Sequence, residues 1–187
     1  FLSMALFLVG AHGANNPVAN AESTITIGNA RFTVLNPRVV RMEWDKKKQF
    51  NNQASFIAVN RNLPVPNFTK SEENGWILIK TDELELRYKI NSGKFTDSNL
   101  SINFKNRTQE QTWKLSDKQT ENLKGTYRTV DRYNGSTYID NSGVVRDEMP
   151  LEDGILSKDG WTLIDDSKSL LFDNSDWQWA EERKSKD

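Results

Sequence analysis

The chain of 187 residues contains no cysteine and a single histidine, His12. Disulfide bonds, thiolate chemistry and cysteine-based zinc sites are therefore excluded. One histidine cannot complete a Ser-His-Asp triad or a histidine-rich metal centre within the chain. No D-x-D-x-D-G loop of the calcium-binding type occurs. We therefore expect no cofactor and no metal, and any acid–base chemistry must come from carboxylates or from another segment.

The chain also lacks an excess of either charge. It has 25 basic and 26 acidic residues, which gives a formal net charge of −1. The longest basic run, Lys46-Lys47-Lys48, is balanced by Glu43 and Asp45 and is typical of a solvated turn. Neither a nucleic acid nor an anionic membrane surface is therefore an expected partner.

Only one long hydrophobic run is present, over residues 1–10 (FLSMALFLVG). Its length suits the apolar region of a signal peptide and is too short to cross a bilayer, and the lack of cysteine argues against a lipid anchor. Small residues follow, so cleavage after Gly13 or after Ala21 would suit a signal peptidase. The chain begins with Phe and has no basic segment before the run, so we expect residues upstream to be missing. We assign residues 1–21 to a partial signal peptide and expect a periplasmic or extracellular protein with no membrane contact after cleavage.

From Ser23 onward the pattern is one of short strands separated by turn residues. Period-two alternation or β-branched content predicts strands over 24–27, 31–35, 39–44, 56–59, 75–80, 84–90 and 100–104. The strand over 84–90 is the clearest, since Leu84, Leu86, Tyr88 and Ile90 share one face and charged residues share the other. Residues 63–66 hold two prolines and cannot form a central strand.

No window between residues 22 and 170 has a convincing helical period. Many short strands with turn signals between them predict an all-β antiparallel sandwich over residues 22–175. Residues 176–187, rich in Trp, Ala, Glu, Arg and Lys, form a helix-capable or linker-like segment.

Two stretches have a more distinctive pattern than the strands. Residues 122–131 read N-L-K-G-T-Y-R-T-V-D, and residues 151–161 read L-E-D-G-I-L-S-K-D-G-W, followed by I-D-D-S at 164–167. Together with a "v-R-i-e-w" strand at 39–44, this order resembles glycoside hydrolase family 31, which contains α-glucosidases, α-xylosidases and α-galactosidases. The first stretch departs from the G-l-G-E loop of many members and is similar to a bacterial subgroup.

The resemblance implies a galactose-mutarotase-like β-sandwich packed beside a (β/α)₈ barrel. It also implies a retaining mechanism with two aspartates, both in the barrel, in motifs of the W-x-D-M-N-E type. No such motif occurs between Phe1 and Asp187. We therefore assign no catalytic residue to this chain, and we take residues 176–187 as a linker or the start of the missing barrel region. The whole protein is expected to hydrolyse α-linked oligosaccharides or glycosides, whereas this chain alone is expected to be inactive.

The acidic residues of the second stretch and of the I-D-D-S turn could form a catalytic carboxylate pair or could serve as turn residues. Retaining glycosidases need two carboxyl groups about 5–5.5 Å apart. Glu152/Asp153 and Asp165/Asp166 are adjacent pairs, which point to opposite faces of a strand. The Asp-Gly pairs at 153–154 and 159–160 are also typical of tight turns.

The resemblance also implies that a sandwich loop reaches the sugar subsites. We therefore name Asp153 and Glu152 first, then Arg128 and Asp131, as substrate-binding candidates. Trp161, at the start of a short apolar strand with Leu163 on the same face, is expected in the core. So are Trp44, Trp76 and Trp113. The stretch 176–179 is expected to pack against the barrel and to leave an apolar patch exposed here.

Two other functions fit the composition. A stand-alone carbohydrate-binding sandwich would use tryptophans as a sugar platform and would show sugar binding without catalysis. A structural or adhesive surface domain would show stability with no response to sugars.

Overall fold

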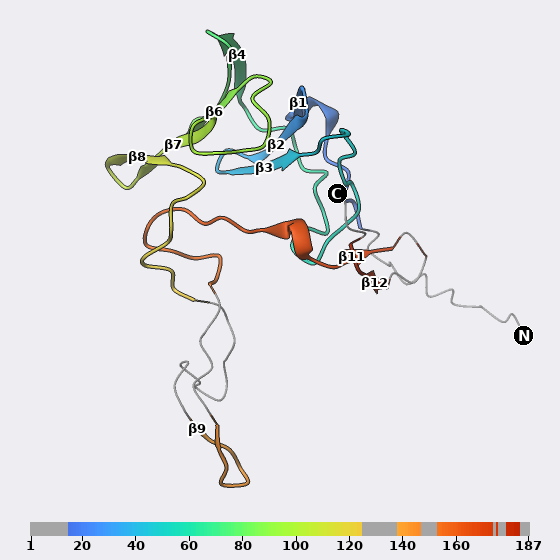
Figure 1. The fold of residues 1–187 in the computed structure, drawn as a ribbon, viewed down its shortest axis with the longest axis vertical. Helices are drawn as coiled ribbons and strands as arrows, with labels where there is room; N and C mark the ends of the chain where they lie inside the picture. The colour runs from blue at the N-terminus through green and yellow to red at the C-terminus, as the bar shows by residue number, and fades with distance from the viewer. Residues whose placement is uncertain (1–14, 125–137, 147–152, 174, 176–178, 184–187) are drawn as a thin grey trace, which may run out of the picture.

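The computed structural model describes residues 15–124, 138–146, 153–173, 175 and 179–183. Within these residues the chain is almost entirely β, with two single 3₁₀ turns as its helical elements. The first, η1 (Ala21–Ser23), leads into a three-stranded antiparallel sheet of β1 (Thr24–Ile27), β2 (Ala30–Asn36) and β3 (Val39–Trp44), in that order (Figure 1).

The second sheet has five strands in chain order, each antiparallel to the next. They are β4 (Thr69–Glu73), β5 (Trp76–Lys80), β6 (Leu84–Lys89), β7 (Leu100–Asn106) and β8 (Gln109–Trp113). Three of the four connections are short turns, and residues 90–99 join β6 to β7, so neighbouring strands in the chain are neighbours in the sheet.

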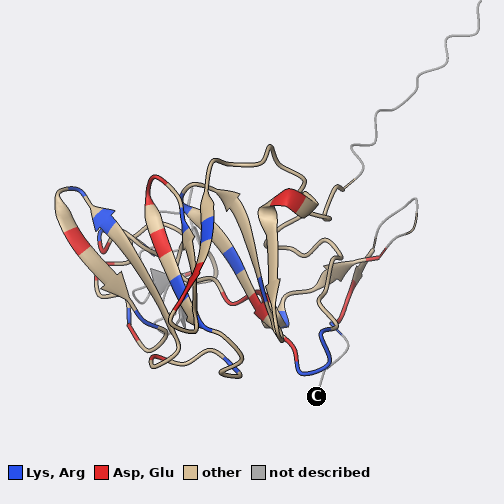
Figure 2. Cartoon of the chain, turned by 90° about the horizontal axis from the view of Figure 1, so that it is seen from above, with Lys and Arg blue, Asp and Glu red and all other residues tan. Residues whose placement is uncertain are grey.

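The core lies between the two sheets and gives the molecule its sandwich-like arrangement. Phe32 of β2 contacts Tyr88 of β6, with ring centroids 5.4 Å apart, and Phe95 closes an aromatic triangle with both. Other buried members are Ile25, Ala30, Val34, Ile77, Ile79, Leu86, Leu100 and Trp113. Charged side chains of both signs are spread along the strands instead of gathering on one sheet (Figure 2).

Three smaller elements follow the sheets. A hairpin of β9 (Tyr138–Ile139) and β10 (Val145–Arg146) lies apart from them (Figure 1). The second 3₁₀ turn, η2 (Asp166–Lys168), precedes β11 (Leu171–Phe172), which pairs with β12 (Ala180–Glu181). β11 also returns to the loop after β3, where the Phe172 N–H donates to the Ala54 carbonyl at 2.9 Å.

Most of the predicted strands are present. The strands predicted over 24–27 and 39–44 have those bounds, and the others of both sheets differ by one or two residues. The alternation of β6 is confirmed, because Leu86 and Tyr88 are buried whereas Arg87 and Lys89 are exposed. The prolines at 64 and 66 lie outside any strand, as expected.

Two predicted strands are absent, the one over residues 56–59 and the one that follows Trp161. Residues 56–59 form no strand, because the Ala58 N–H turns back to the Ser55 carbonyl at 3.1 Å and leaves Phe56 and Ile57 exposed. The described part of the helix-capable segment, residues 179–183, contains β12, which is held in a strand by its pairing with β11.

The structure also adds strands that the hydrophobic pattern did not show. β4 is exposed at all five positions and has no apolar face, so it is an edge strand formed by pairing with β5. Asn74 and Gly75, which join the two strands, both have positive φ, of 51° and 79°. That is the backbone of a two-residue hairpin turn, for which Asn-Gly is the preferred sequence.

The segment before η1 packs against the sandwich. The Asn16 carbonyl accepts from the N–H groups of Arg61 and Asn62, at 2.8 and 3.2 Å. The Pro17 carbonyl accepts from Nε of Arg61 at 2.7 Å. Asn16 and Pro17, which the sequence analysis assigned to the partial signal peptide, therefore contact the loop at 61–62. No helix in the described part of the chain is long and apolar enough to span a membrane.

Candidate functional site

The two distinctive stretches of the sequence meet in the structure. The Leu123 N–H donates to the Leu156 carbonyl at 2.9 Å, and the Lys158 N–H donates to the Glu121 carbonyl at 3.1 Å. An isolated antiparallel bridge joins Asn122 to Ser157 between these bonds. We call the paired residues 119–124 and 153–161 the clamp. It forms although the two segments are about 30 residues apart in the chain and neither is part of a sheet.

The side chain of Asn122 fastens one end of the clamp. Its Oδ1 accepts from the Gly154 N–H, and its Nδ2 donates to the Gly154 carbonyl, both at 2.9 Å. Oδ1 also accepts from the Lys124 N–H, and Nδ2 also donates to Oε1 of Gln119, each at 2.7 Å. One side chain therefore satisfies both backbone groups of Gly154, as a neighbouring strand would.

Asp159 fastens the other end. Its carboxylate accepts from the N–H groups of Thr120 and Glu121 at 2.8 and 2.9 Å, and from the hydroxyls of Thr120 and Ser157, each at 2.9 Å. The Glu121 N–H, followed by the Thr120 N–H and the two hydroxyls, lowers the pKa of the Asp159 carboxyl to about 2. Asp159 is therefore ionised at neutral pH and acts as a structural acceptor.

Residues 157–160 also form the tight turn that the Asp159-Gly160 pair predicted. The Gly160 N–H donates to the Ser157 carbonyl at 3.3 Å, and Gly160 has φ of +82°. A Cβ on Gly160 would lie 2.6 Å from Cγ of Asn106, whose Nδ2 donates to the Lys158 carbonyl at 3.2 Å. Glycine is required here by both backbone conformation and space.

Trp161 joins the clamp to the sandwich core. Its ring lies 6.1 Å from that of buried Trp113, centroid to centroid, and its backbone carbonyl accepts from Nε2 of Gln119. The core positions predicted for Trp113 and Trp161 are thus confirmed, and Trp44 also packs against the core. Trp76 is half-buried under the guanidinium of Arg87. The strand predicted after Trp161 is absent, and Leu163 and Ile164 are exposed in an irregular segment.

Asp153 is the one substrate-binding candidate that lies within the described residues. It is on the outside of the clamp, with 60% of its side chain exposed, and Oδ1 pairs with Nζ of Lys124 at 2.7 Å. A carboxylate beside an ammonium offers both an acceptor and a donor to a neutral polar ligand. Glu152, Arg128 and Asp131 lie outside the described residues.

Asp165 and Asp166 point to different partners. Asp165 caps η2 by accepting from the Ser167 N–H at 2.9 Å, which confirms the I-D-D-S turn. Asp166 instead accepts from the Ser55 hydroxyl at 3.0 Å and lies 3.7 Å from Arg183. Both carboxylates therefore have structural partners and do not form a facing pair.

Three apolar side chains on the paired segments of the clamp are exposed. Ile155 and Leu156 are 71% and 64% exposed, and Leu123 on the paired segment is 55% exposed. We call these three residues the apolar rim. Apolar side chains of this size in a cluster mark an interaction surface more often than a solvent-facing one.

The sequence showed only part of this site. Ser157 and Asp159 exchange local hydrogen bonds at a spacing of two residues, which is a readable turn signal. The pairing of Asn122 with Gly154 has no local signal, because it depends on how the chain returns after residue 124.

The described residues include no group of three or more histidine, aspartate and glutamate side chains that could hold a metal ion. No protein-family model matches the chain. No curated protein matches it either.

Proposed function

We propose that this chain is the N-terminal β-sandwich of a secreted retaining α-glycosidase that resembles glycoside hydrolase family 31. The observation that supports the proposal is the clamp, because it pairs the described parts of the two stretches that resemble the family, residues 122–124 and 153–161. The all-β, sandwich-like architecture agrees with the galactose-mutarotase-like sandwich of the proposal. The catalytic aspartates belong to a barrel that follows this chain.

In this proposal the clamp has two roles. The apolar rim packs against the barrel, which removes its exposed side chains from water. Burial of apolar surface stabilises by roughly 25 cal/mol per Å², so three such side chains form a substantial contact. The polar edge with Asp153 and Lys124 then faces the sugar subsites, where hydroxyl groups pair with carboxylate and ammonium.

The rigid core of the clamp suits this positioning role. A loop that lends one carboxylate to a sugar site must hold it within a fraction of an ångström. Asn122 and Asp159 supply that rigidity from either end, since together they bond eight partner groups. Glu152, Arg128 and Asp131 remain candidates for further contacts to the sugar.

The reading frame past the codon for Asp187 tests the proposal. We expect several hundred further codons that encode alternating strands and helices and a W-x-D-M-N-type motif. A stop codon directly after Asp187, or a continuation without that motif, would contradict it.

A second candidate is a carbohydrate-binding sandwich without catalysis. It is favoured by Trp179, which is 67% exposed and could offer its ring to a sugar. Tryptophan fluorescence of the chain titrated with α-linked oligosaccharides separates the two proposals. Saturable binding that is lost in Trp179→Ala, together with a stop codon after Asp187, supports the binding module.

A further inference from the structure

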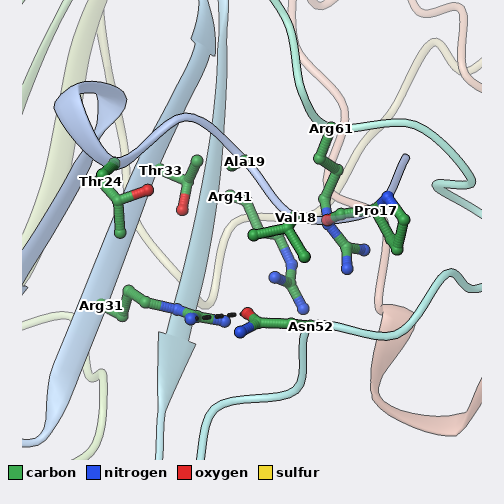
Figure 3. Close-up of a pocket in the computed structure, with 10 residues that line it drawn as sticks. Pro17, Val18, Ala19, Thr24, Arg31, Thr33, Arg41, Asn52 and Arg61 are labelled. Carbon is green, nitrogen blue, oxygen red and sulfur yellow. Dashed lines mark hydrogen bonds between the residues drawn. The ribbon is translucent and has the colours of Figure 1, made fainter.

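Three arginines converge on a cavity between the first sheet and the segment before it. Arg31 comes from β2, Arg41 from β3 and Arg61 from the following loop, and all three line a cavity of about 200 Å³. Pro17 and Val18 form its other wall. Figure 3 shows the three guanidinium groups directed toward the same space, with Arg31 bonded to Asn52.

One carboxylate serves two of these arginines. Glu43 accepts from Nε and Nη2 of Arg31 at 2.7 and 2.9 Å, and its Oε1 forms an ion pair with Nη2 of Arg41 at 2.9 Å. Both of its oxygens are therefore occupied by the first two arginines. No carboxylate in the described part of the chain lies within ion-pair distance of Arg61.

Arg61 is a buried cation. It is 2% exposed, and its guanidinium donates to the backbone carbonyls of Pro17, Gln53 and Ala58 at 2.7, 2.7 and 3.4 Å. Burial, and then the charge of Arg41, lowers the pKa of Arg61 to about 10. The group is still charged at neutral pH, and buried charges are ordinarily paired.

The wider surroundings leave the region positive. Adding Asp166 and Arg183, which influence the same arginines, gives four guanidinium groups against two carboxylates and a surplus of two positive charges. Glu181 and Glu182 line the adjoining hollow but are exposed to water, where solvent and salt screen their charge.

We propose that this cavity is a binding site for a small inorganic oxyanion of the phosphate or sulfate class. Guanidinium groups present planar pairs of donors that match tetrahedral oxyanions. The cavity is partly open to solvent and has room for such an ion. Bound there, the ion neutralises the surplus charge and ties the segment at 15–20 to β2 and β3. The proposal does not depend on the function proposed above.

Thermal unfolding of the chain, followed by tryptophan fluorescence, tests the site. Sodium phosphate is titrated up to about 20 mM, and sodium chloride of equal ionic strength is the control. This range covers a site with a Kd of about 1 mM, which corresponds to a binding free energy of about −4 kcal/mol. We expect a saturable rise in Tm, with the folded-to-unfolded ratio increasing about tenfold at ten times the apparent Kd. An equal response to chloride would overturn the proposal.

Variants assign the effect to the cavity. Arg41→Gln is expected to abolish the saturable rise, whereas Arg38→Gln, at an exposed arginine paired with Glu83, is expected to keep it. Glu43→Gln removes the competing carboxylate and keeps three arginines, so half-saturation should fall to a several-fold lower phosphate concentration. A phosphate response unchanged in both Arg41→Gln and Glu43→Gln would contradict the assignment. Isothermal titration calorimetry of the folded variants gives the same comparison without unfolding.

Discussion

Asp159 shows how much one half-buried carboxylate can organise. Its four hydrogen bonds come from a segment almost 40 residues earlier and from its own turn. These bonds favour the ionised form, so the pKa falls from 3.8 to about 2 in the folded protein. A carboxylate that accepts several hydrogen bonds generally has a lowered pKa, because the bonds stabilise its charged form.

This shift predicts an acid-sensitive clamp. The stabilisation from Asp159 is fully present above pH 4 and is lost as the pH falls toward 2, because protonation removes the acceptor. Asp97, Asp165 and Asp173 also have lowered pKa values, so the comparison needs a variant. Asp159→Asn should be less stable at pH 7, and its stability should converge with that of the unaltered chain near pH 2.

Urea unfolding between pH 2 and pH 7 makes this measurement, with the carboxyl titration followed by NMR. The other three aspartates remain in both proteins, so the difference isolates Asp159. A constant difference in unfolding free energy across the whole range would contradict the assignment of the pKa.

Asp153 is expected to act on substrate and not on stability. In the full reading-frame product, Asp153→Ala should raise KM for α-glycosides about tenfold, since a charge-assisted hydrogen bond of about 1.5 kcal/mol corresponds to that factor. kcat should change less than KM, because the proposal gives this group a role in binding and none in catalysis.

The same substitution should change the unfolding free energy by less than about 1 kcal/mol, because the pair with Lys124 is exposed. In the unfolding measurement, Lys124→Met is the matched control for loss of the ion pair. Unchanged KM in Asp153→Ala would remove this residue from the substrate site.

At the scale of elements, the clamp is held by side chains in place of a strand ladder. Asn122→Ala removes four hydrogen bonds and is expected to destabilise the protein by about 1–3 kcal/mol, since each bond contributes about 0.5–1.5 kcal/mol and some are replaced by water. Asn122→Asp should lower the stability by at least as much, because a carboxylate cannot donate to the Gly154 carbonyl. Chemical denaturation measures both.

Asn62→Ala, at an exposed position, provides the control and should stay within about 0.5 kcal/mol of the unaltered chain. Equal stability of Asn122→Ala and the control would show that the clamp forms without the amide.

The segment at 15–21 is the second element that local patterns did not identify as folded. A chain starting at residue 22 loses the carbonyls of Asn16 and Pro17, which accept from Arg61 and Asn62. Leaving a buried guanidinium short of a partner is costly, so we expect a loss of about 3 kcal/mol relative to a chain starting at residue 15. Comparison of the two chains by urea unfolding measures it, and equal midpoints would contradict it.

The contacts of Asn16 and Pro17 also bear on the expected signal peptide. Cleavage after Gly13 would keep the contacts of residues 16 and 17, whereas cleavage after Ala21 would remove them. If the signal peptide is cleaved, these contacts favour cleavage after Gly13, which N-terminal sequencing of the mature protein would test.

At the scale of the whole molecule, the sequence was sufficient where hydrophobic alternation decides the structure. β1 and β6 each have buried positions on one face, and β3 packs Val40, Met42 and Trp44 against the core, so the sequence pattern alone located these three strands. β4 could not be found in this way, since an edge strand with five exposed residues forms only because β5 offers a ladder.

The clamp and the arginine cavity depend on long-range pairing. Asn122 meets Gly154 across 32 residues, and Arg61 meets Pro17 across 44. No periodicity in one sequence encodes such contacts. The sequence therefore predicted the residues of the clamp as a distinctive motif, but not their partners or the structural role of Asp159.

Hydrolysis of α-glycosides by the complete reading-frame product tests the central claim most directly. The protein is assayed with 4-nitrophenyl α- and β-glycosides of glucose, xylose and galactose, and the anomer first released from a natural α-linked oligosaccharide is identified by NMR. We predict hydrolysis of at least one α-glycoside with release of the α-anomer, as a retaining mechanism requires. Hydrolysis of β-glycosides alone, release of the β-anomer, or no hydrolysis by a folded product would contradict the claim.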